Sequence, residues 1–357
     1  MRVLFIQGRS QKGGAQTCLA RLIFQLKQSS IIPVLLCGKK GWLTNECQRM
    51  GVSTLIEDFP SSRSIYGRLF ANNMFARRVN HHLELRDLVP QIIFANDYLE
   101  GLIGIGLEKE IGAKTIMLLR SSGMNSGDYK KYKCRDYDVV AAIGDQLNSM
   151  AREWDSRKEI ERVYDGISSD EFLAPKAHKA SRPGKILIIG SELPSKGWAD
   201  ISEAMRQLQE STDFDWSLDF TGNEPDPRFN NMFLANIKPG TFNFLGKRDA
   251  FRELVRKYDL VINPSRRESF GMAAIEVLAA GVPLLSTRTG VMEKIQSSPR
   301  CLVSPSSPEC LSSAIKYIYQ YWGEVDFRVG ECQNNIKKYF LINNIASRWE
   351  NLFLSIS

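Results

Sequence analysis

Two glutamates frame one loop and the helix predicted to follow it. Glu268 stands in a polar loop, and Glu276 lies eight positions further along the chain. A carboxylate can accept two hydrogen bonds at once, which suits the adjacent hydroxyl groups of a sugar. Eight helical positions bring a side chain back to within about 80° of its starting direction, given about 100° per residue. The spacing therefore predicts that both carboxylates address one ligand, at two depths.

The backbone between these glutamates offers a site for a negatively charged group. Residues 272–280 are rich in strong helix formers, and the predicted helix ends at Gly281 with Pro283 just beyond. The first N–H groups of a helix have no partner inside it, and they lie at the positive end of the helix dipole. We therefore expect the amides of residues 269–272 to bind phosphate or another anionic oxygen.

A strand before the loop and a strand after the helix must position these residues. Residues 260–262 form a short apolar run that is typical of a buried parallel strand, and Pro264 ends it. The next strand is predicted at 284–287. In an open α/β sheet the loops that follow the strands meet at one edge, and ligands bind there.

The segment 264–287, PSRRESFGMAAIEVLAAGVPLLST, resembles the signature of the retaining GT-B glycosyltransferases of the family 4 type, the glycosyl transferases group 1. That signature combines two Glu residues separated by seven positions with a Phe-Gly pair and an Ala-Gly-x-Pro turn. The resemblance implies that Glu268 binds hydroxyls of the donor sugar, that Glu276 binds the ribose, and that amides of 269–272 hold the diphosphate. From the spacing alone, an ordinary capped helix with glutamates of no special role is the alternative.

The resemblance also implies the fold and the domain order. The fold class would be α/β of the GT-B type, with two Rossmann-like doubly wound domains facing a central cleft and a C-terminal helix that crosses back to the first domain. A length of 357 residues is natural for two domains. The expected parts are an acceptor-binding domain at 1–173, a linker at 174–185, a nucleotide-sugar-binding domain at 186–337 and a terminal helix at about 338–357. Apolar runs predict strands in the first half at 2–7, 32–37, 52–56, 91–95, 115–119 and 139–143.

Two cations clamp the donor diphosphate in the family. Lys196 matches the lysine, but Ser191 occupies the place of the arginine. Either Arg266, Arg267 or Arg248 supplies the second charge, or diphosphate binding is weakened.

A glycine pair, Gly13-Gly14, resembles the pair that follows the first strand in the family and lets the donor phosphate and the acceptor approach. It is not a GxGxxG motif, and no acidic residue closes a second strand to hold an NAD ribose, which disfavours a dehydrogenase. The full predicted donor-binding set is Gly13, Gly14, Ser191, Lys196, Gly222, Leu245, Arg266, Arg267, Glu268, Ser269, Phe270, Gly271, Met272 and Glu276.

The predicted catalytic set is Glu268, Lys196, Arg120 and Asp97. Many relatives carry a histidine where Arg120 stands, with Asp97 at the end of the preceding strand. Arg120 either holds an anionic acceptor or the transferring sugar, or is a loop arginine without such a role. Enzymes of this type lack an obvious carboxylate nucleophile, and the resemblance implies front-face attack in which a donor phosphate oxygen takes the acceptor proton.

Neither a metal nor a cofactor is expected besides the nucleotide-diphosphate sugar. The sequence contains seven cysteines but no CxxC pair, and only three histidines, so no zinc-type ligand set can be assembled by spacing. Two Asp-x-Asp spacings, at 136–138 and 213–215, match a metal motif of other glycosyltransferases. Such spacings are common by chance, and the GT-B solution uses a helix terminus and cations instead.

Residues 61–86 interleave five arginines with apolar residues and contain one acid. Such a helix can lie on an anionic membrane, or it can pack its apolar face on the sheet and leave its arginines solvated. A net charge of +7 suits anionic partners but does not choose among them. Because no apolar run approaches the roughly 18 residues of a membrane span and no signal peptide is evident, we expect a cytoplasmic protein, at the inner face of the plasma membrane if 61–86 binds lipid.

The predicted function is therefore a retaining, metal-independent hexosyltransferase. It would move a sugar from a nucleotide-diphosphate sugar, with a UDP-sugar favoured, to a glycan or lipid-linked acceptor in cell-surface polysaccharide or lipopolysaccharide synthesis. No nucleic acid partner is expected. The alternatives are a GT-B protein that binds a sugar nucleotide or a partner without turnover, and a non-hydrolysing sugar-nucleotide epimerase.

Overall fold

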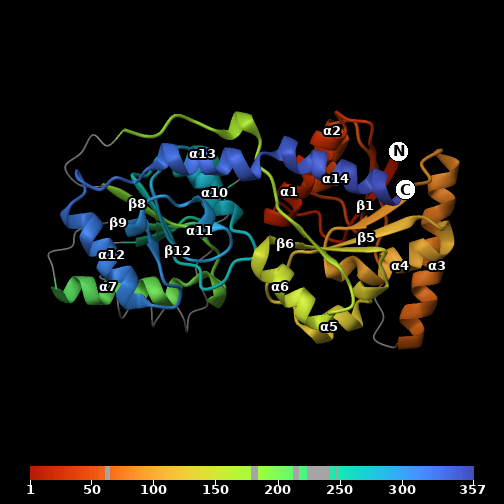
Figure 1. Ribbon diagram of the computed structural model, residues 1–357, viewed down its shortest axis with the longest axis horizontal. Coiled ribbons are helices and arrows are strands. Elements are labelled where there is room, and N and C mark those ends of the chain that lie inside the picture. The colour runs from red at the N-terminus through yellow and green to blue at the C-terminus, as the bar shows by residue number, and fades with distance from the viewer. Residues whose placement is uncertain (61–64, 178–183, 212–216, 223–241, 247, 249) are drawn as a thin grey trace. The chain divides into compact units, whose positions relative to one another are not determined.

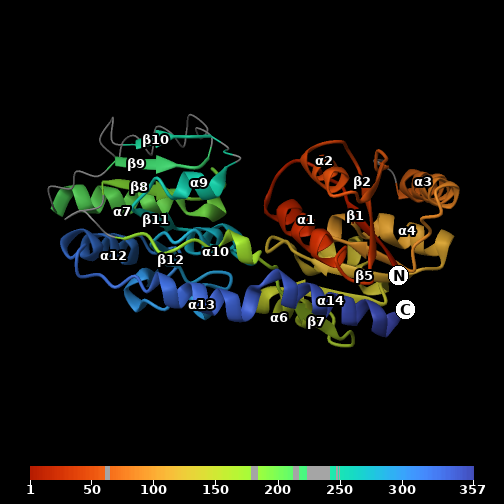
Figure 2. The same ribbon diagram turned by 90° about the horizontal axis from the view of Figure 1, so that it is seen from above.

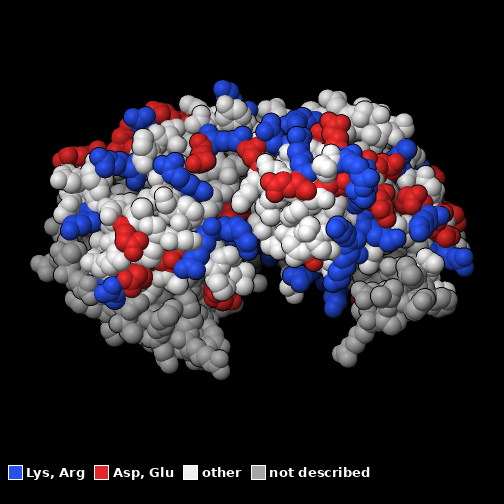
Figure 3. Space-filling view, turned by 60° about the horizontal axis from the view of Figure 1, so that its bottom comes forward, with Lys and Arg blue, Asp and Glu red and all other residues white. Residues whose placement is uncertain are grey.

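The computed structural model describes the chain except for residues 61–64, 178–183, 212–216, 223–241, 247 and 249. The chain divides into two compact units, the first formed by 1–168 with 340–357 and the second by 169–339 (Figure 1). On the face shown in Figure 3, Lys and Arg side chains are interspersed with Asp and Glu side chains on both units.

A parallel sheet of seven strands forms the centre of the first unit, in the order β3-β2-β1-β4-β5-β6-β7. Its strands are β1 (Arg2–Gln7), β2 (Ile32–Cys37), β3 (Ser53–Ile56), β4 (Ile92–Ala95), β5 (Lys114–Leu119), β6 (Val139–Ile143) and β7 (Ile160–Val163). The six predicted strands are confirmed to within a residue, and β7 is an edge strand that the apolar pattern did not indicate. The order reverses between β1 and β4, so the chain leaves these two strands in opposite directions.

Helices cover both faces of this sheet (Figure 2). They are α1 (Gly14–Leu26), α2 (Trp42–Arg49), α3 (Ile65–Leu85), α4 (Gly101–Ile111), α5 (Ser126–Lys131), α6 (Gly144–Trp154) and α14 (Ile342–Ile356). On one face, Trp349 and Phe353 of α14 contact Phe94 of β4. The last helix of the chain is therefore part of the first unit, as the predicted fold class requires.

The second unit repeats the same plan around a sheet of six strands, in the order β10-β9-β8-β11-β12-β13. Its strands are β8 (Lys185–Ile188), β9 (Ser217–Phe220), β10 (Phe242–Phe244), β11 (Leu260–Asn263), β12 (Leu284–Thr287) and β13 (Leu302–Val303). Its helices are α7 (Trp198–Ser211), α9 (Phe251–Val255), α10 (Met272–Ala279), α11 (Met292–Ile295), α12 (Pro308–Gln320) and α13 (Val329–Phe340). All strand pairs are parallel, and the order reverses between β8 and β11. Both units are thus doubly wound, which confirms the predicted architecture.

The chain that enters the second unit is anchored on that unit before β8 begins. The Leu173 amide donates to the Ala279 carbonyl at 2.9 Å, and the Lys176 amide donates to the Gly281 carbonyl at 2.7 Å. Residues 178–183 of the predicted linker lie outside the described residues. The predicted domain boundaries of 173/174 and 185/186 stay predictions beside the observed division at 168/169.

The described side chains of α3 belong to an ordinary layer of the fold. Phe75, Val79 and Leu83 are buried in the core between α3, α4 and the sheet. On the outer side, Arg78 pairs with Glu57 at 3.0 Å. Because the sheet already covers this apolar face, a membrane contact would use the basic side of the helix, and it stays a prediction. In the part of the chain that is described, no helix combines the length and apolar character needed to cross a membrane.

Candidate functional site

A proline begins the loop between β11 and α10, and a glycine in the left-handed backbone region ends it. Pro264 follows β11 directly, and Gly271 caps α10 with φ 95°, in the left-handed region that favours glycine. Gly281, two positions after the last residue of α10, has φ 77°. The predicted helix at 272–280 is confirmed as Met272–Ala279, so its first amides lie at the end of this loop.

Lys196 and Glu268 form the centre of the site. Nζ of Lys196 lies 2.7 Å from Oε1 of Glu268, and the two side chains are 25% and 16% exposed. Lys196 reaches this position from the short 3₁₀ turn Pro194–Lys196 that follows β8. Because β8 and β11 are neighbours in the sheet, the loops that follow them meet at the point where the strand order reverses. The cation and the carboxylate of the predicted catalytic set are therefore in direct contact.

A glycine allows these two loops to approach. Gly197 has φ 73°, and a Cβ atom placed on it would lie 1.9 Å from the carbonyl oxygen of Pro264. Any other residue would push the loop that carries Lys196 away from the loop that carries Glu268. The close contact of the pair thus depends on the missing side chain at position 197.

Ser265 orients the carboxylate of Glu268 through a hydrogen bond. Its Oγ lies 2.7 Å from Oε1 of Glu268, and its carbonyl accepts a hydrogen bond from Oγ1 of Thr287 at 2.6 Å. Ser265 and Thr287 are both fully buried. The supports of Glu268 therefore come from β12 as well as from its own loop, and such supporting bonds hold a binding group in one orientation.

Arg266 braces the same loops through an ion pair. Its guanidinium binds both carboxylate oxygens of Asp200 at 2.7 and 2.6 Å, and its backbone amide donates to the Ser195 carbonyl at 2.8 Å. The hydrogen bonds to Asp200 raise the pKa of Arg266. Asp200 is only 3% exposed. The charge of Arg266 is matched within the fold, and its predicted contact with the donor stays a prediction.

The helical-step argument that linked Glu268 and Glu276 does not apply to this structure. As predicted, Glu268 lies in the loop before α10, which begins only at Met272, so the eight positions between the two glutamates are not all helical. A loop residue is not constrained to the 100° step of a helix. Glu276 is a partly exposed residue of α10. Their contact with one ligand stays a prediction, and it rests on the resemblance rather than on helical geometry.

The other predicted donor residues of the second unit follow the strands of the same sheet. Gly222 comes after β9, and the Leu245 amide, after β10, donates to the Phe220 carbonyl at 2.9 Å. The Phe270 carbonyl accepts from the Val291 amide at 3.0 Å. The residues that the structure thereby brings to this sheet edge are Ser191, Lys196, Gly222, Leu245, Arg266, Arg267, Glu268, Ser269, Phe270, Gly271 and Met272. In the first unit, Gly13 precedes α1 as its N-cap residue, and Gly14 is the first residue of α1.

The predicted catalytic residues of the first unit sit in a buried polar network. Nη1 of Arg120 lies 2.8 Å from both carboxylate oxygens of Asp165, and its Nε donates to Oδ1 of Asn96 at 2.9 Å. Arg120 is 7% exposed. Burial is the largest single effect and lowers the pKa of Arg120, but the charge of Asp165, its hydrogen bonds and smaller electrostatic effects together raise that pKa. A direct contact with an anionic acceptor would compete with Asp165, so this geometry favours a positioning role for Arg120.

Asp97 caps the turn after β4. Its carboxylate accepts from the Tyr98 amide at 2.8 Å and from Oγ of Ser121 at 2.8 Å. Burial raises the pKa of Asp97, and these hydrogen bonds oppose the shift. Asp97 therefore links the ends of β4 and β5, where we predict that the acceptor binds.

Glu100 is a candidate functional residue that the sequence patterns did not indicate. It is 4% exposed, and its Oε1 accepts from the Gly8 amide at 2.8 Å. Its Oε2 is buried and has no hydrogen-bond partner among the described residues. Burial raises the pKa of Glu100 to about 8. A signal was present, because an acid that precedes the almost wholly apolar run GLIGIGL of α4 is expected to be buried with it.

Glu100 is also connected to Arg120. Nε2 of Gln7 lies 3.4 Å from Oε1 of Glu100, and Oε1 of Gln7 accepts from Nδ2 of Asn96 at 2.5 Å. Asn96 in turn accepts from Arg120. The network therefore follows the carboxyl ends of β1, β4 and β5, across the point where the strand order of the first unit reverses.

The structure describes only one of the two Asp-x-Asp spacings. Oδ2 of Asp138 accepts from the amide and hydroxyl of Thr115 at 2.8 and 2.9 Å, and Asp136 lies 3.8 Å from Lys133. Residues 213 and 215 lie outside the described residues. Within the described ranges, no group of three or more His, Cys, Asp and Glu residues is placed to hold a metal ion.

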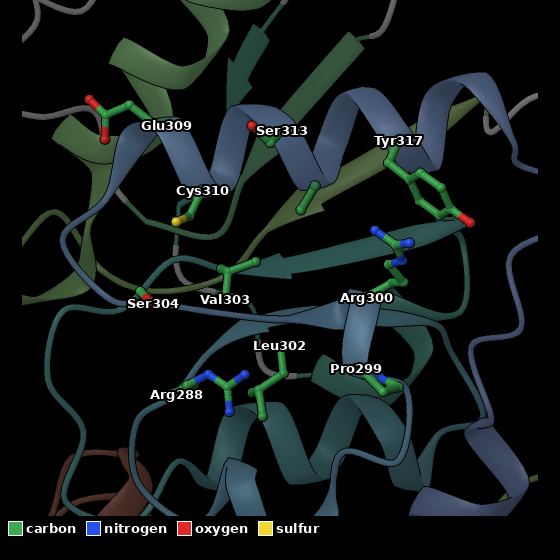
Figure 4. A pocket seen from close by; sticks show the side chains of 11 residues that line it. Arg288, Pro299, Arg300, Leu302, Val303, Ser304, Glu309, Cys310, Ser313 and Tyr317 are labelled. Atoms are coloured by element: carbon green, nitrogen blue, oxygen red, sulfur yellow. The ribbon is translucent and has the colours of Figure 1, made fainter.

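The second unit also has a pocket of about 400 Å³ between the edge strand β13 and α12 (Figure 4). Leu302 and Val303 line it from the strand, Cys310 and Tyr317 line it from the helix, and the guanidinium of Arg300 lies over the Tyr317 ring. None of the predicted donor-binding residues lines this pocket. We therefore place the candidate site at the loops around Lys196 and Glu268.

The fold that this geometry defines is that of the GT-B glycosyltransferases. The structure resembles the crystal structure of Anabaena HepE in complex with UDP and glucose with a TM-score of 0.81, over 99% of this chain and 100% of that chain, at 14% sequence identity. At that identity the likeness shows the fold alone, and it confirms the predicted fold class.

Residues 183–321 match the family model of the glycosyl transferases group 1, which confirms the resemblance found in the sequence. N-acetyl-alpha-D-glucosaminyl L-malate synthase of Bacillus anthracis is 28% identical over 61% of this chain and 60% of its own length. The lipopolysaccharide glucosyltransferase WaaG of Escherichia coli is 24% identical over 44% of this chain and 40% of its own. The chain thus spans 60% or less of the length of these curated relatives.

Proposed function

We propose that the protein is a retaining glycosyltransferase that moves a hexosyl unit from a nucleotide-diphosphate sugar to a glycan or lipid-linked acceptor. The observation that carries the proposal is the Lys196–Glu268 pair, held at 2.7 Å beside the N-terminus of α10 at the switch point of a GT-B sheet. A UDP-sugar is the favoured donor, since HepE binds UDP and glucose. The E. coli relative, which acts on lipopolysaccharide, favours an acceptor of cell-surface polysaccharide or lipopolysaccharide synthesis.

The site would separate its own ion pair when the donor binds. Nζ of Lys196 would bind the donor diphosphate together with the first amides of α10, and the carboxylate of Glu268 would accept hydrogen bonds from the sugar hydroxyls. Each partner exchanges one polar contact for another, so no buried charge is left alone. The helix terminus and the cation then stabilise the negative charge that develops on the leaving diphosphate.

The reaction would proceed on one face of the sugar. The bond between the anomeric carbon and the β-phosphate oxygen breaks, and the acceptor oxygen forms its new bond from the same side. The acceptor proton passes to an oxygen of the departing diphosphate, so no carboxylate nucleophile is required. Positive charge from Lys196 and the helix terminus takes the place of a metal ion, which makes metal-independent transfer the expectation.

The acceptor would bind at the first unit, near the ends of β4 and β5. Asp97 and Ser121 present polar groups there, and the Arg120–Asp165 pair fixes the backbone that carries them. Location in the cytoplasm, at the inner face of the plasma membrane, belongs to the same proposal, because nucleotide sugars and lipid-linked acceptors meet there.

Transfer by purified protein tests this function. The donors are UDP-glucose, UDP-galactose, UDP-N-acetylglucosamine and GDP-mannose, offered with lipopolysaccharide core or lipid-linked oligosaccharide and with or without EDTA. We expect acceptor-dependent release of one nucleoside diphosphate, an anomeric configuration equal to that of the donor by NMR, and no loss with EDTA. Glu268→Ala should lower transfer by roughly 100-fold or more with an unchanged circular dichroism spectrum.

Glu309→Ala is the matched control, because Glu309 is an exposed residue of α12 in the same unit. If Glu268→Ala transfers as well as the wild type, the site assignment is wrong. Binding of nucleoside diphosphate without turnover of any donor would favour the second candidate, a GT-B binding protein. Two departures from the family pattern support this candidate: Ser191 replaces an arginine, and Arg120 replaces a histidine. Interconversion of the free sugar nucleotide would indicate an epimerase.

A further inference from the structure

We propose that Arg267 supplies the second positive charge that binds the donor diphosphate beside Lys196, and this assignment rests on the proposed function. A diphosphate carries at least two negative charges, whereas Lys196 and Glu268 form a pair with no net charge. Ser191, in the loop after β8, offers a hydroxyl group but no charge. The arginines around the site must therefore be compared one by one.

The guanidinium of Arg266 is already bound to an acidic partner. Its two bonds to Asp200, at 2.7 and 2.6 Å, use the flat edge of the guanidinium that would bind a phosphate bidentately. Moving this guanidinium to a ligand would leave the carboxylate of Asp200, 3% exposed, buried without its partner. Leaving a buried charge unpaired in this way is strongly unfavourable. Arg266 is therefore a brace of the loops and not a mobile cation.

Arg248 belongs to a loop that lies farther along the sheet. It follows β10, whereas Lys196 follows β8 and Glu268 follows β11. In the strand order β10-β9-β8-β11, β10 is two strands away from β8 and three away from β11. Neighbouring strands lie about 4.8 Å apart, so the ends of β10 and β11 are separated by about 14 Å.

Arg267 meets the requirements that the other two fail. Its side chain is exposed, and it has no acidic partner among the residues that the structure describes. Its backbone amide lies 3.3 Å from the Ser195 carbonyl, which also accepts from the Arg266 amide, so the position is fixed next to Lys196 and Glu268. The planar guanidinium is well suited to bind two phosphate oxygens at once. Arg267 is thus the cation of this loop that can turn to a ligand without breaking a pair.

Calorimetric titration with UDP, GDP and ADP tests the assignment at low and at physiological salt. For the nucleotide that binds the wild type, Arg267→Gln should raise Kd by about tenfold or more and reduce the salt dependence of binding, with an unchanged thermal midpoint. Arg267→Lys should recover part of the affinity. Arg248→Gln should bind as the wild type does, and Arg266→Gln should lower the thermal midpoint because Asp200 loses its partner.

The failures can be told apart. If Arg267→Gln binds the nucleotide as tightly as the wild type while Glu268→Ala abolishes transfer, the role of Arg267 is overturned and the proposed function stands. If Arg248→Gln and not Arg267→Gln loses affinity, the second cation has been misassigned. A wild-type protein that binds none of the three nucleotides would overturn the proposed function and this assignment together.

Discussion

At the scale of single residues, burial changes the chemistry of Glu100. Its carboxyl group holds the Gly8 amide at the end of β1, although burial raises its pKa to about 8 from an ordinary value of 4.5. Between these two pH values the folded protein binds more protons than the unfolded chain does. Stability therefore falls as pH rises through this window, and it levels off above it.

We predict that Glu100→Gln removes this pH dependence. Between pH 5 and pH 8, the free energy of unfolding of the variant relative to that of the wild type should increase by an amount on the order of 3 kcal/mol. Urea denaturation at four or five pH values measures the difference. Glu153→Gln, at an exposed position of α6 in the same unit, is the control and should follow the wild type. Parallel curves for Glu100→Gln and the wild type would show that the Glu100 carboxyl is not perturbed by burial.

A second prediction separates two roles of Arg120. If Arg120 acts through its pair with Asp165, both Arg120→Gln and Asp165→Asn should lower the free energy of unfolding by about 3 kcal/mol or more, because each leaves a buried charge alone. The double variant should be less destabilised than the sum of the two. Thermal and urea unfolding supply the measurement. An Arg120→Gln protein of normal stability but low transfer would instead mean that Arg120 contacts the acceptor or the sugar.

At the scale of elements, the site depends on how closely the loops after β8 and β11 approach. Gly197 permits that approach, and it also has a left-handed backbone. Gly112, which ends α4, has a similar φ of 75° but nothing within 4 Å of the position that a Cβ atom would take. The two glycines therefore distinguish backbone strain from a steric clash.

We predict that Gly112→Ala costs about 1 kcal/mol, the usual penalty of a left-handed alanine. Gly197→Ala should cost at least about 2 kcal/mol more, because its Cβ atom would overlap the Pro264 carbonyl oxygen, and it should also weaken nucleotide binding by separating Lys196 from Glu268. Unfolding curves and calorimetric titration with UDP test both effects. Equal losses of unfolding free energy in the two variants would mean that the loops after β8 and β11 can move apart without destabilising the fold.

At the scale of the whole molecule, the two units share one architectural plan. Each is a doubly wound sheet with a reversal of strand order, and each gathers polar side chains at the carboxyl ends of the strands that flank the reversal. Apart from Gly13 and Gly14, the proposed donor-binding residues all belong to the second unit. Ligand binding to that unit should therefore stabilise it by mass action, independently of the acceptor.

Hydrogen exchange with and without saturating UDP tests this division. We expect the strongest added protection in the loops that follow β8 and β11 and in the first turn of α10, all in the second unit. The core of the first unit, around Phe94 and Trp349, should change less. Protection confined to the first unit would place the nucleotide elsewhere and contradict the proposed donor site.

Much of the fold followed from local patterns. Six strands of the first sheet and the strand–loop–helix–strand unit around Glu268 are visible in the sequence, because short apolar runs, prolines and glycines act over a few neighbouring residues. The edge strand β7 was not predicted, because apolar and polar residues alternate only weakly in its sequence IERV. Glu100 escaped because the burial of a carboxyl depends on what packs around it.

By itself, the sequence determined the residue types of the donor loop, the positions of its strand and helix, and the resemblance that points to a sugar nucleotide. Only the tertiary structure decided that Lys196 pairs with Glu268, 72 positions away, and that Arg266 is bound to Asp200 while Arg267 is not. The physical reason is the strand order. Parallel pairing of β8 with β11 brings together loops that are distant in the chain, and no local propensity encodes which strands become neighbours.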